Sequence, residues 1–239
     1  PNLPQISEVG VARSNTEFDP VTANSYAINE LRFGNAALKP EQNRNSSIGL
    51  TGYSKNWSYS IDWWQIEQSD LVGLIPGQTR LLYDSLLRSH GLSDSAVIRD
   101  IDNNVTELRN QYINLNPRQI SGLDYSISFG KETSLGYVKS ELNIARLLSF
   151  TQQLDPVSQS VIDAQRSRVE AVPADVVVEN VGDLLKINGR PKWRINLTNQ
   201  WRFNQWLLAL NINYVSDFHD DSVWNSAGEL LPVDSYLTF

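Results

Sequence analysis

The chain has 239 residues, a formal net charge of −7 at pH 7 and a pI near 4.9, and this acidic balance argues against nucleic acid as a partner. It contains no Cys, which excludes disulfide bonds and thiolate metal sites. No apolar run approaches the ~18 residues that a membrane-spanning helix needs.

Six segments alternate apolar and polar residues, which predicts strands with one apolar and one polar face. In chain order they are 44–54, 57–64, 123–129, 135–150, 193–203 and 206–214. A seventh strand begins near Asp234. In the fourth segment Val138, Leu142 and Ile144 share a phase that Leu147 leaves, which predicts a β-bulge there.

The last two strands carry aromatic residues at both ends. Trp193 and Trp201 lie eight residues apart, about 26 Å along an extended strand, or roughly 20 Å of height at a tilt of ~40°. Trp206 and Tyr214 repeat this spacing on the return strand. Because the apolar band of an outer-membrane barrel is ~25 Å tall, we expect these four side chains at the two lipid interfaces.

Short and long connections alternate between the predicted strands. The short ones lie near 54–56, 130–134 and 203–205; the long ones are Glu67–Gln111, Thr151–Gly189 and Asp217–Val233, with 45, 39 and 17 residues. In an antiparallel meander, alternate connections lie at opposite ends of the sheet, so one end carries all the long segments. Transmembrane β-barrels have this asymmetry, with short periplasmic turns and long extracellular loops. The alternative is a soluble β-sandwich whose Trp residues fill a core.

The first long connection contains one predicted helix, Thr79–Gly91, with Thr79 as a possible N-cap and Gly91 as a C-cap. Its apolar face is formed by Leu82, Tyr83, Leu86 and Leu87. The three long connections have formal charges of −3, −3 and −4, together −10, against −7 for the whole chain. An acidic mouth would mildly disfavour strongly anionic ligands and suit neutral or cationic ones. The alternative, which we favour, is that the acidic segments stay hydrated and bind divalent ions of a lipopolysaccharide surface.

The third long connection contains a candidate metal site. Its ligands would be Asp217, His219, Asp220 and Asp221. A hydrated acidic loop explains the same residues and is the interpretation that we favour, so no metal is expected. The patterns H-E-x-x-H, G-x-S-x-G, G-x-G-x-x-G and the Walker loop are absent from the sequence, so we expect neither enzymatic activity nor a cofactor.

Four stretches carry a family resemblance: PNLPQ from Pro1, FGNAALKPEQNRNSSIGL from Phe33, QYINLNPRQISGLDYSISF from Gln111 and GRPKWRINLTNQW from Gly189. In this order they resemble the C-terminal part of the β-barrel of TonB-dependent receptors, which are outer-membrane transporters. The most specific stretch follows the family's N-P-x-L-x-P-E pattern, with Ala36 where the family usually has Pro. The matching residues are Asn35, Leu38, Lys39, Pro40 and Glu41. Because Pro40 forces Lys39 out of the helical region, we interpret this motif as local architecture.

The resemblance implies that residues 1–239 are one partial barrel domain. The expected fold is all-β: an antiparallel transmembrane β-barrel segment of about six strands plus a partial seventh, with long extracellular loops and a short helix. Barrels of this class have about 22 strands, so we expect an N-terminal plug domain and further strands outside this sequence. The start at Pro1 and the absence of Met agree with a piece of a longer or processed protein.

The resemblance also implies a function in the outer membrane of a Gram-negative bacterium. The receptor would import a scarce ligand, such as a ferric siderophore, cobalamin or an oligosaccharide, with TonB-coupled energy. Its partners would be outer-membrane lipid and lipopolysaccharide, the plug of the same parent chain, TonB through that plug, and a small-molecule ligand. The alternatives are a passive porin and a soluble lectin-like β-sandwich.

Four polar-phase residues are candidates for the lumen of such a barrel. They are Asp62, Asp124, Arg194 and Arg202. The resemblance implies that they contact the plug or line the transport path. Ordinary lumen hydration and cross-strand pairing are the alternative for any single one of them.

Overall fold

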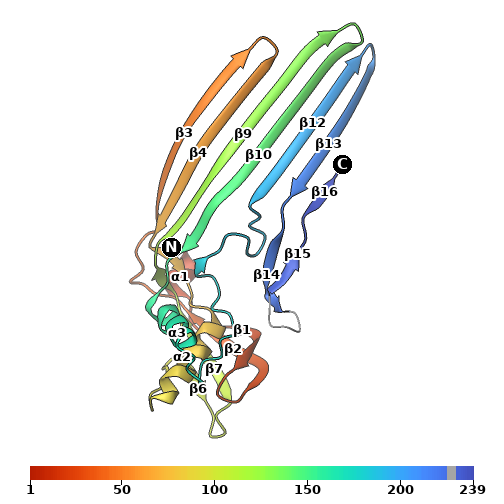
Figure 1. Cartoon of the computed structure of the whole chain (residues 1–239). Coiled ribbons are helices and arrows are strands. Elements are labelled where there is room, and N and C mark those ends of the chain that lie inside the picture. The colour runs from red at the N-terminus through yellow and green to blue at the C-terminus, as the bar shows by residue number, and fades with distance from the viewer. Residues whose placement is uncertain (225–229) are drawn as a thin grey trace. The chain divides into compact units, whose positions relative to one another are not determined.

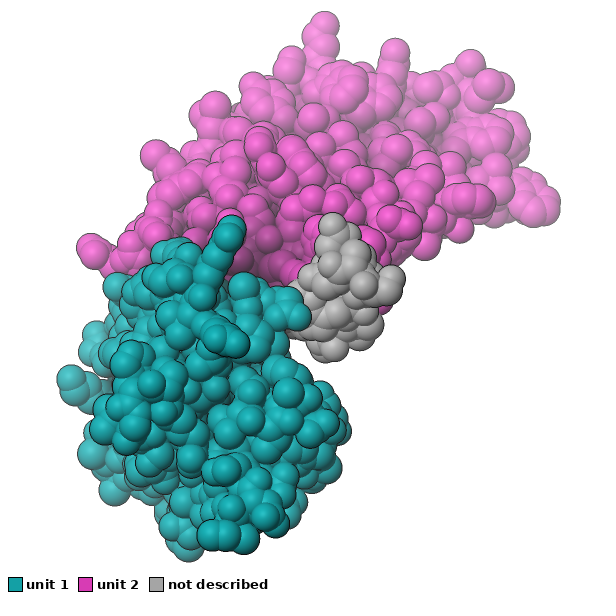
Figure 2. Space-filling view, turned by 60° about the horizontal axis from the view of Figure 1, so that its bottom comes forward, with its two compact units in different colours: residues 1–43, 68–118, 152–182 teal, residues 44–67, 119–151, 183–239 magenta. Residues whose placement is uncertain are grey.

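The computed structural model describes the backbone of residues 1–224 and 230–239, and side chains up to residue 220 and from residue 230 onward. The chain forms two compact units (Figure 2). The loop unit comprises residues 1–43, 68–118 and 152–182, and the strand unit comprises residues 44–67, 119–151 and 183–239. No helix among the described residues is long and apolar enough to cross a membrane.

Long antiparallel strands dominate the strand unit (Figure 1). They are β3 (Gln42–Ser54), β4 (Trp57–Ser69), β9 (Arg118–Thr133), β10 (Gly136–Gln152), β12 (Trp193–Phe203), β13 (Trp206–Val215) and β16 (Tyr236–Thr238). Their order in the sheet is β16-β13-β12-β10-β9-β4-β3, and β11 (Gly182–Asp183) pairs with β10. The six predicted strands and the partial seventh are therefore confirmed.

The strand register brings the apolar residues of neighbouring strands onto one face. Between β12 and β13, Ile195 pairs with Tyr214 and Leu197 pairs with Ile212. Between β10 and β12, Ile144 pairs with Ile195. Because side chains alternate with a period of two, a slip by one residue would turn the whole apolar set of a strand to the opposite side. We call the two sides the apolar face and the polar face.

One irregularity interrupts β10. The Ser126 and Asn143 side chains hydrogen-bond across β9 and β10 at 2.9 Å, and Ser121 and Ser149 do so at 2.7 Å. Between these two contacts the chain runs five residues along β9 but six along β10. The additional residue in β10 is the mark of a β-bulge, and it agrees with the bulge predicted near Leu147.

The three short connections are tight turns that need unusual backbone angles. Lys55 and Asn204 have φ values of 50° and 52°, and Gly136 has a φ of 101°. A Cβ added at Gly136 would also overlap the carbonyl group of Arg202 on the neighbouring strand. Glycine at this position therefore allows both the turn and the close approach of β12.

The first two long connections are not irregular loops. Together with the N-terminal residues they fold into the compact loop unit. Its main sheet has the order β1 (Val11–Asp19), β2 (Asn24–Phe33), β7 (Val105–Gln111) and β6 (Val97–Arg99). The β2–β7 pairing is parallel and joins residues 30–33 to residues 108–111. The unit also contains α1 (Leu3–Ser7), α2 (Gly77–Ser89), α3 (Pro156–Arg166) and the β5 (Leu71–Gly73) and β8 (Ile113–Leu115) pair.

Helix α2 supplies a buried leucine to each of two small cores. Leu81 packs with Ile28, Val97, Val105 and Leu108 of the sheet. Leu82 packs against α3 and the segment that follows it, through Val161, Ala164 and Val172. The predicted apolar face of this helix omitted Leu81, which is fully buried. The omission arose because α2 packs on two sides and not along a single stripe.

The predicted ends of α2 were partly wrong. The N-cap residue is Pro76, which makes no side-chain capping bond, and Thr79 lies buried within the first turn. At the other end Gly91 has a φ of 75°, and the amide of Leu92 donates to the Leu87 carbonyl at 2.9 Å. The C-cap is His90, so the predicted end at Gly91 was off by one residue, and Gly91 takes the left-handed conformation directly after the cap.

The third long connection also contains secondary structure. Strands β14 (Phe218–Trp224) and β15 (Leu230–Val233) pair in antiparallel orientation, where the sequence predicts an acidic loop. Alternation over so few residues does not distinguish a short hairpin from an irregular loop.

Candidate functional site

A groove of about 540 Å³ lies on the polar face of the strand unit. It is lined by Asp62 of β4, Asp124 of β9 and Arg194 of β12, three of the four predicted lumen residues. The fourth, Arg202, is not among the lining residues, and its guanidinium lies 5.8 Å from the Tyr137 ring near the short turns. The strand register therefore brings three predicted residues to one groove and leaves one outside it.

Glycine residues make room for the larger side chains of this face. A Cβ added at Gly49 of β3 would overlap the Asp62 carboxylate. In the same way, a Cβ added at Gly122 of β9 would meet the Trp64 indole. Each side chain thus lies against the backbone of the neighbouring strand, which limits its rotamers.

Neutral hydrogen bonds link the strands across this face. Asn196 donates to Asn213 at 2.6 Å, and Thr198 donates to Asn211 at 2.8 Å. Among the described residues, neither Asp62 nor Asp124 forms an ion pair. The groove therefore offers two carboxylates, amides and a guanidinium to whatever polar surface it meets.

The apolar face carries aromatic residues near the short turns. Trp201 and Trp206 are 37% and 67% exposed, and Trp201 Nε1 donates to the Leu135 carbonyl at 2.6 Å. On the neighbouring strands Trp57 contacts Phe129, with ring centroids 4.7 Å apart. These rings end a band of exposed and half-buried aliphatic residues, an arrangement typical of a membrane interface.

The two remaining predicted interface residues lie at the strand ends that are far from the short turns. Trp193 is the first residue of β12, and Tyr214 is the last but one of β13. The Arg146 guanidinium lies 4.8 Å from the Trp193 ring, so an apolar ring and a cation occur together at this end. The headgroup depth of all four aromatic residues remains a prediction.

The acidic segment that was considered as a metal site is engaged in other contacts. The Asp217 carboxylate forms an ion pair with Lys186 at 2.6 Å. The backbone of His219 is bonded on both sides, to the Lys186 carbonyl and to the Asn188 amide. The side chain of Asp221 lies outside the described residues, so its position is not assigned. Within the described residues, no three His, Asp or Glu side chains are grouped as a metal would require.

The segment Asn35–Glu41 is hydrogen-bonded to two other segments of the loop unit. Asn35 donates to the Tyr112 carbonyl at 3.0 Å, and the Glu41 carboxylate accepts from the Val72 amide at 2.8 Å. Between them the Lys39 amide donates to the side chain of Asn114 at 2.9 Å, and that side chain returns a bond to the Lys39 carbonyl. These contacts support the architectural interpretation of the motif.

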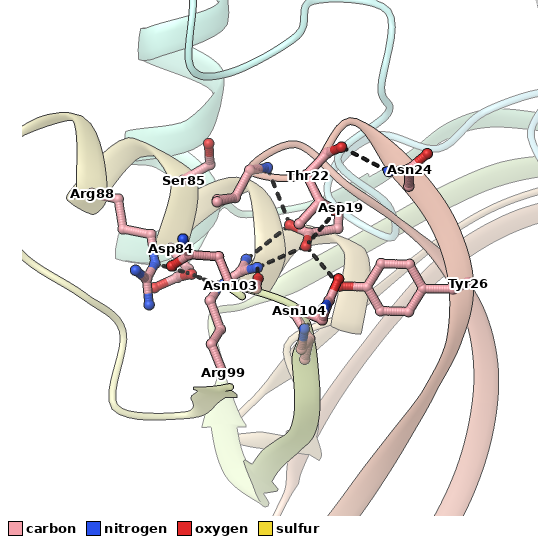
Figure 3. Close-up of polar contacts among 12 residues, drawn as sticks. Asp19, Thr22, Asn24, Tyr26, Asp84, Ser85, Arg88, Arg99, Asn103 and Asn104 are labelled. Atoms are coloured by element: carbon pink, nitrogen blue, oxygen red, sulfur yellow. Dashed lines mark hydrogen bonds and ion pairs between the residues drawn. The ribbon is translucent and has the colours of Figure 1, made fainter. Parts of the chain in front are cut away.

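A buried charge cluster in the loop unit was not anticipated from the sequence (Figure 3). Arg99 donates to both carboxylate oxygens of Asp19, at 2.7 and 2.8 Å, and to Asp84 at 2.9 Å. Tyr26 donates to Asp19 at 2.7 Å and accepts from the Val105 amide. The cluster unites β1, β2, α2 and β6, which no local sequence pattern could indicate.

The electrostatics of this cluster follow from burial and pairing. Burial raises the pKa of Asp19, but the hydrogen bonds from Arg99 and Tyr26 outweigh it and hold that pKa below its ordinary value. Burial lowers the pKa of Arg99, and its two aspartate partners raise it overall. Asp19 and Arg99 therefore stay charged and paired at neutral pH, which gives the cluster a structural role.

Comparisons with known proteins agree with this architecture. The family model described as TonB dependent receptor-like, beta-barrel matches residues 9–239. A search of curated proteins finds no match. The siderophore receptor PirA from Acinetobacter baumannii is similar with a TM-score of 0.55 and 15% identity, over 100% of this chain and 30% of that chain.

A second solved structure gives the same result. A mutant of the ferric enterobactin receptor PfeA from Pseudomonas aeruginosa is similar with a TM-score of 0.58 and 12% identity, over 99% of this chain and 27% of that chain. This chain therefore spans less than a third of the length of the two receptors. At these identities the likeness shows a shared fold.

Proposed function

Because the chain belongs to the TonB dependent receptor-like β-barrel family of the outer membrane, we propose that it is part of a receptor that imports a scarce small molecule with TonB-coupled energy. The remaining strands and a plug domain would belong to the same parent protein. The chain would supply barrel wall and extracellular structure, and it would catalyse no reaction.

The difference between the two faces of the strand unit carries this proposal. The exposed Leu208, Leu210 and Trp206 side chains share the apolar face, which suits lipid. Asp62, Asp124 and Arg194 line a groove on the opposite face, which suits a wet lumen. A sheet that is apolar on one side and polar on the other, with all long connections leaving one end, is what a large barrel requires.

In this proposal the groove meets the plug or the passing ligand. Its carboxylates and its guanidinium can form hydrogen bonds to the backbone of a plug without any need for a fixed partner sequence. Arg202, close to the short turns, would lie near the periplasmic end of the lumen. Ferric siderophores are the first ligands to test, because receptors for them share this fold.

The experiment measures uptake by cells that make the full-length parent protein. Radiolabelled ferric enterobactin, cobalamin and a maltose oligosaccharide are offered to otherwise identical cells with and without TonB. We expect accumulation of at least one of them only when TonB is present. Asp124→Asn and Arg194→Gln should lower this uptake at unchanged surface levels, whereas Glu132→Gln and Lys131→Gln, at the end of β9 beside a short turn, should not.

The same experiment separates the alternatives. Accumulation that persists without TonB would overturn active import in favour of a passive porin. Recovery of the parent protein in the soluble fraction would favour a lectin-like domain. Accumulation of none of the three ligands would remove the ligand classes proposed here.

A further inference from the structure

The strand unit contains a second pocket, of about 270 Å³, at the end of the sheet from which the long connections leave. It adjoins the groove described above and shares Asp124, Ala145 and Arg194 with it. Two further arginines, Arg146 and Arg190, also line this pocket. All of its lining residues belong to the strand unit, so the pocket depends on one compact body of the chain.

The lining of this pocket carries an excess of positive charge. Three arginines against one aspartate give a formal charge of +2, that is, three minus one. Among the described residues, none of these four side chains forms an ion pair. The local charge is therefore opposite to the −10 of the long connections, and a doubly negative group would balance it.

Arg190 is held in place by a turn that is attached to the end of β10. The amide of Leu184 donates to the Phe150 carbonyl at 2.8 Å, and the amide of Lys186 donates to the Arg190 carbonyl at 3.0 Å. The Arg190 guanidinium lies 4.6 Å from the Phe150 ring and donates to the Ile187 carbonyl at 3.0 Å. Because these contacts already restrict the side chain, a ligand would lose little affinity to the ordering of Arg190.

The three arginines differ in what they can offer to a bound molecule. Arg194 is exposed and Arg190 is half-buried, and a guanidinium has five N–H donors, more than their bonds to backbone carbonyls use. The Arg146 guanidinium lies 4.8 Å from the Trp193 ring, and its Nε is enclosed by protein. We therefore assign ligand contacts to Arg190 and Arg194, whereas Arg146 adds positive charge only.

We propose that this pocket binds a small dicarboxylate with an apolar body. One carboxylate accepts from the Arg190 guanidinium and the other from that of Arg194, since a guanidinium matches the geometry of a carboxylate. The apolar body packs on Trp64 and Ile120, which line the same pocket. The access of this ligand from outside the cell rests on the proposed function, in which the long connections are extracellular. Among the ligand classes open to import, the pocket thus selects anionic molecules.

The test uses the purified full-length parent protein in an uncharged detergent and isothermal titration calorimetry. Three probes share one ring: phthalate has two adjacent carboxylates, benzoate has one, and benzamide has none. We expect saturable binding of phthalate, at least fivefold weaker binding of benzoate and no saturable binding of benzamide. Equal binding of phthalate and benzoate would overturn the proposal. Absence of phthalate binding would also overturn it and leave the pocket to an acidic segment of the plug.

Variants tie the binding to the named side chains. Arg190→Gln and Arg194→Gln should each weaken phthalate binding about tenfold and reduce its advantage over benzoate. Because the Arg194 side chain is exposed, its replacement tests the site even where Arg190→Gln does not fold. Lys139→Gln removes a cation of β10 that lies outside the pocket, and it should change nothing.

Two results separate this site from the proposed import. Wild-type phthalate binding by Arg194→Gln would refute the site and leave TonB-dependent uptake to be judged separately. Phthalate binding by a parent protein that shows no TonB-dependent uptake would refute the proposed import and leave this site standing.

Discussion

Arg99 binds Asp19 in a bidentate ion pair inside the loop unit, with side chains that are 3% and 0% exposed. The two residues lie 80 positions apart in the sequence. Because the same guanidinium also donates to the buried Asp84, one side chain pairs with two carboxylates that water cannot reach. The integrity of the loop unit should therefore depend on Arg99.

Arg99→Ala should destabilise the loop unit by about 3–5 kcal/mol, since it leaves buried charges unpaired. Hydrogen exchange of residues 11–33 and 97–111 in the full-length parent measures the loss as faster local opening. The matched control is Arg88→Ala, because Arg88 also binds Asp84 but its side chain is 31% exposed. It should cost less than about 1 kcal/mol. Equal protection in the two variants would show that the cluster does not hold the unit together.

Glu17 should make the loop unit less stable as the pH rises. Burial, with the charges of Glu179 and Glu30, raises the pKa of Glu17 from 4.5 to about 7. The folded state therefore holds a proton that the unfolded state has released, so the stabilisation is complete below pH 4.5 and is lost as the pH passes about 7. After allowance for solvent screening, we expect a loss of roughly 1–2 kcal/mol.

Glu17→Gln should flatten this dependence, as measured by hydrogen exchange of β1 and β2 at pH 5 and pH 8 with correction for intrinsic rates. Glu107→Gln, which changes an acid paired with Arg109, should keep the wild-type slope. The lowered pKa of Asp19 acts in the opposite direction and only at lower pH, where stability is lost as the pH falls. An unchanged slope in Glu17→Gln would assign the effect to another group.

The alternating connections predict which sites are accessible on intact cells. Single cysteines are introduced into the full-length parent, freed of any other cysteine, at Ile101 in the loop unit and at Asn204 in a short turn. An impermeant thiol reagent should label Ile101→Cys, which is 96% exposed, without disruption of the outer membrane. Asn204→Cys should react only after the membrane is breached. The reverse result would invert the orientation of the barrel.

Adjacent residues of β13 should differ in their tolerance of charge. Leu210 is on the apolar face, so Leu210→Arg should cost ~2–4 kcal/mol, the range for a cation near the bilayer midplane. Asn211 is on the polar face, where Asn211→Arg loses the bond from Thr198, about 1 kcal/mol. Unfolding titrations of the parent protein in bilayers compare the two. Similar costs would mean that the faces are assigned wrongly.

The sequence by itself determined the faces and the turns of the strand unit. Alternation over ten or more residues has a period of two, which fixes both strand identity and the side to which each residue points. Asp62, Asp124 and Arg194 could therefore be assigned to one face before their grouping in a groove was known. The bulge in β10 could also be predicted from the sequence, because Leu147 breaks the alternation of its strand.

Only the tertiary structure decided that the long connections are folded. The parallel pairing of β2 with β7 and the bond between Arg99 and Asp19 join segments roughly 80 residues apart, and such pairings leave no periodic signal in either segment. Local patterns specify which face a residue occupies, whereas contacts between distant segments depend on the packing of the whole unit.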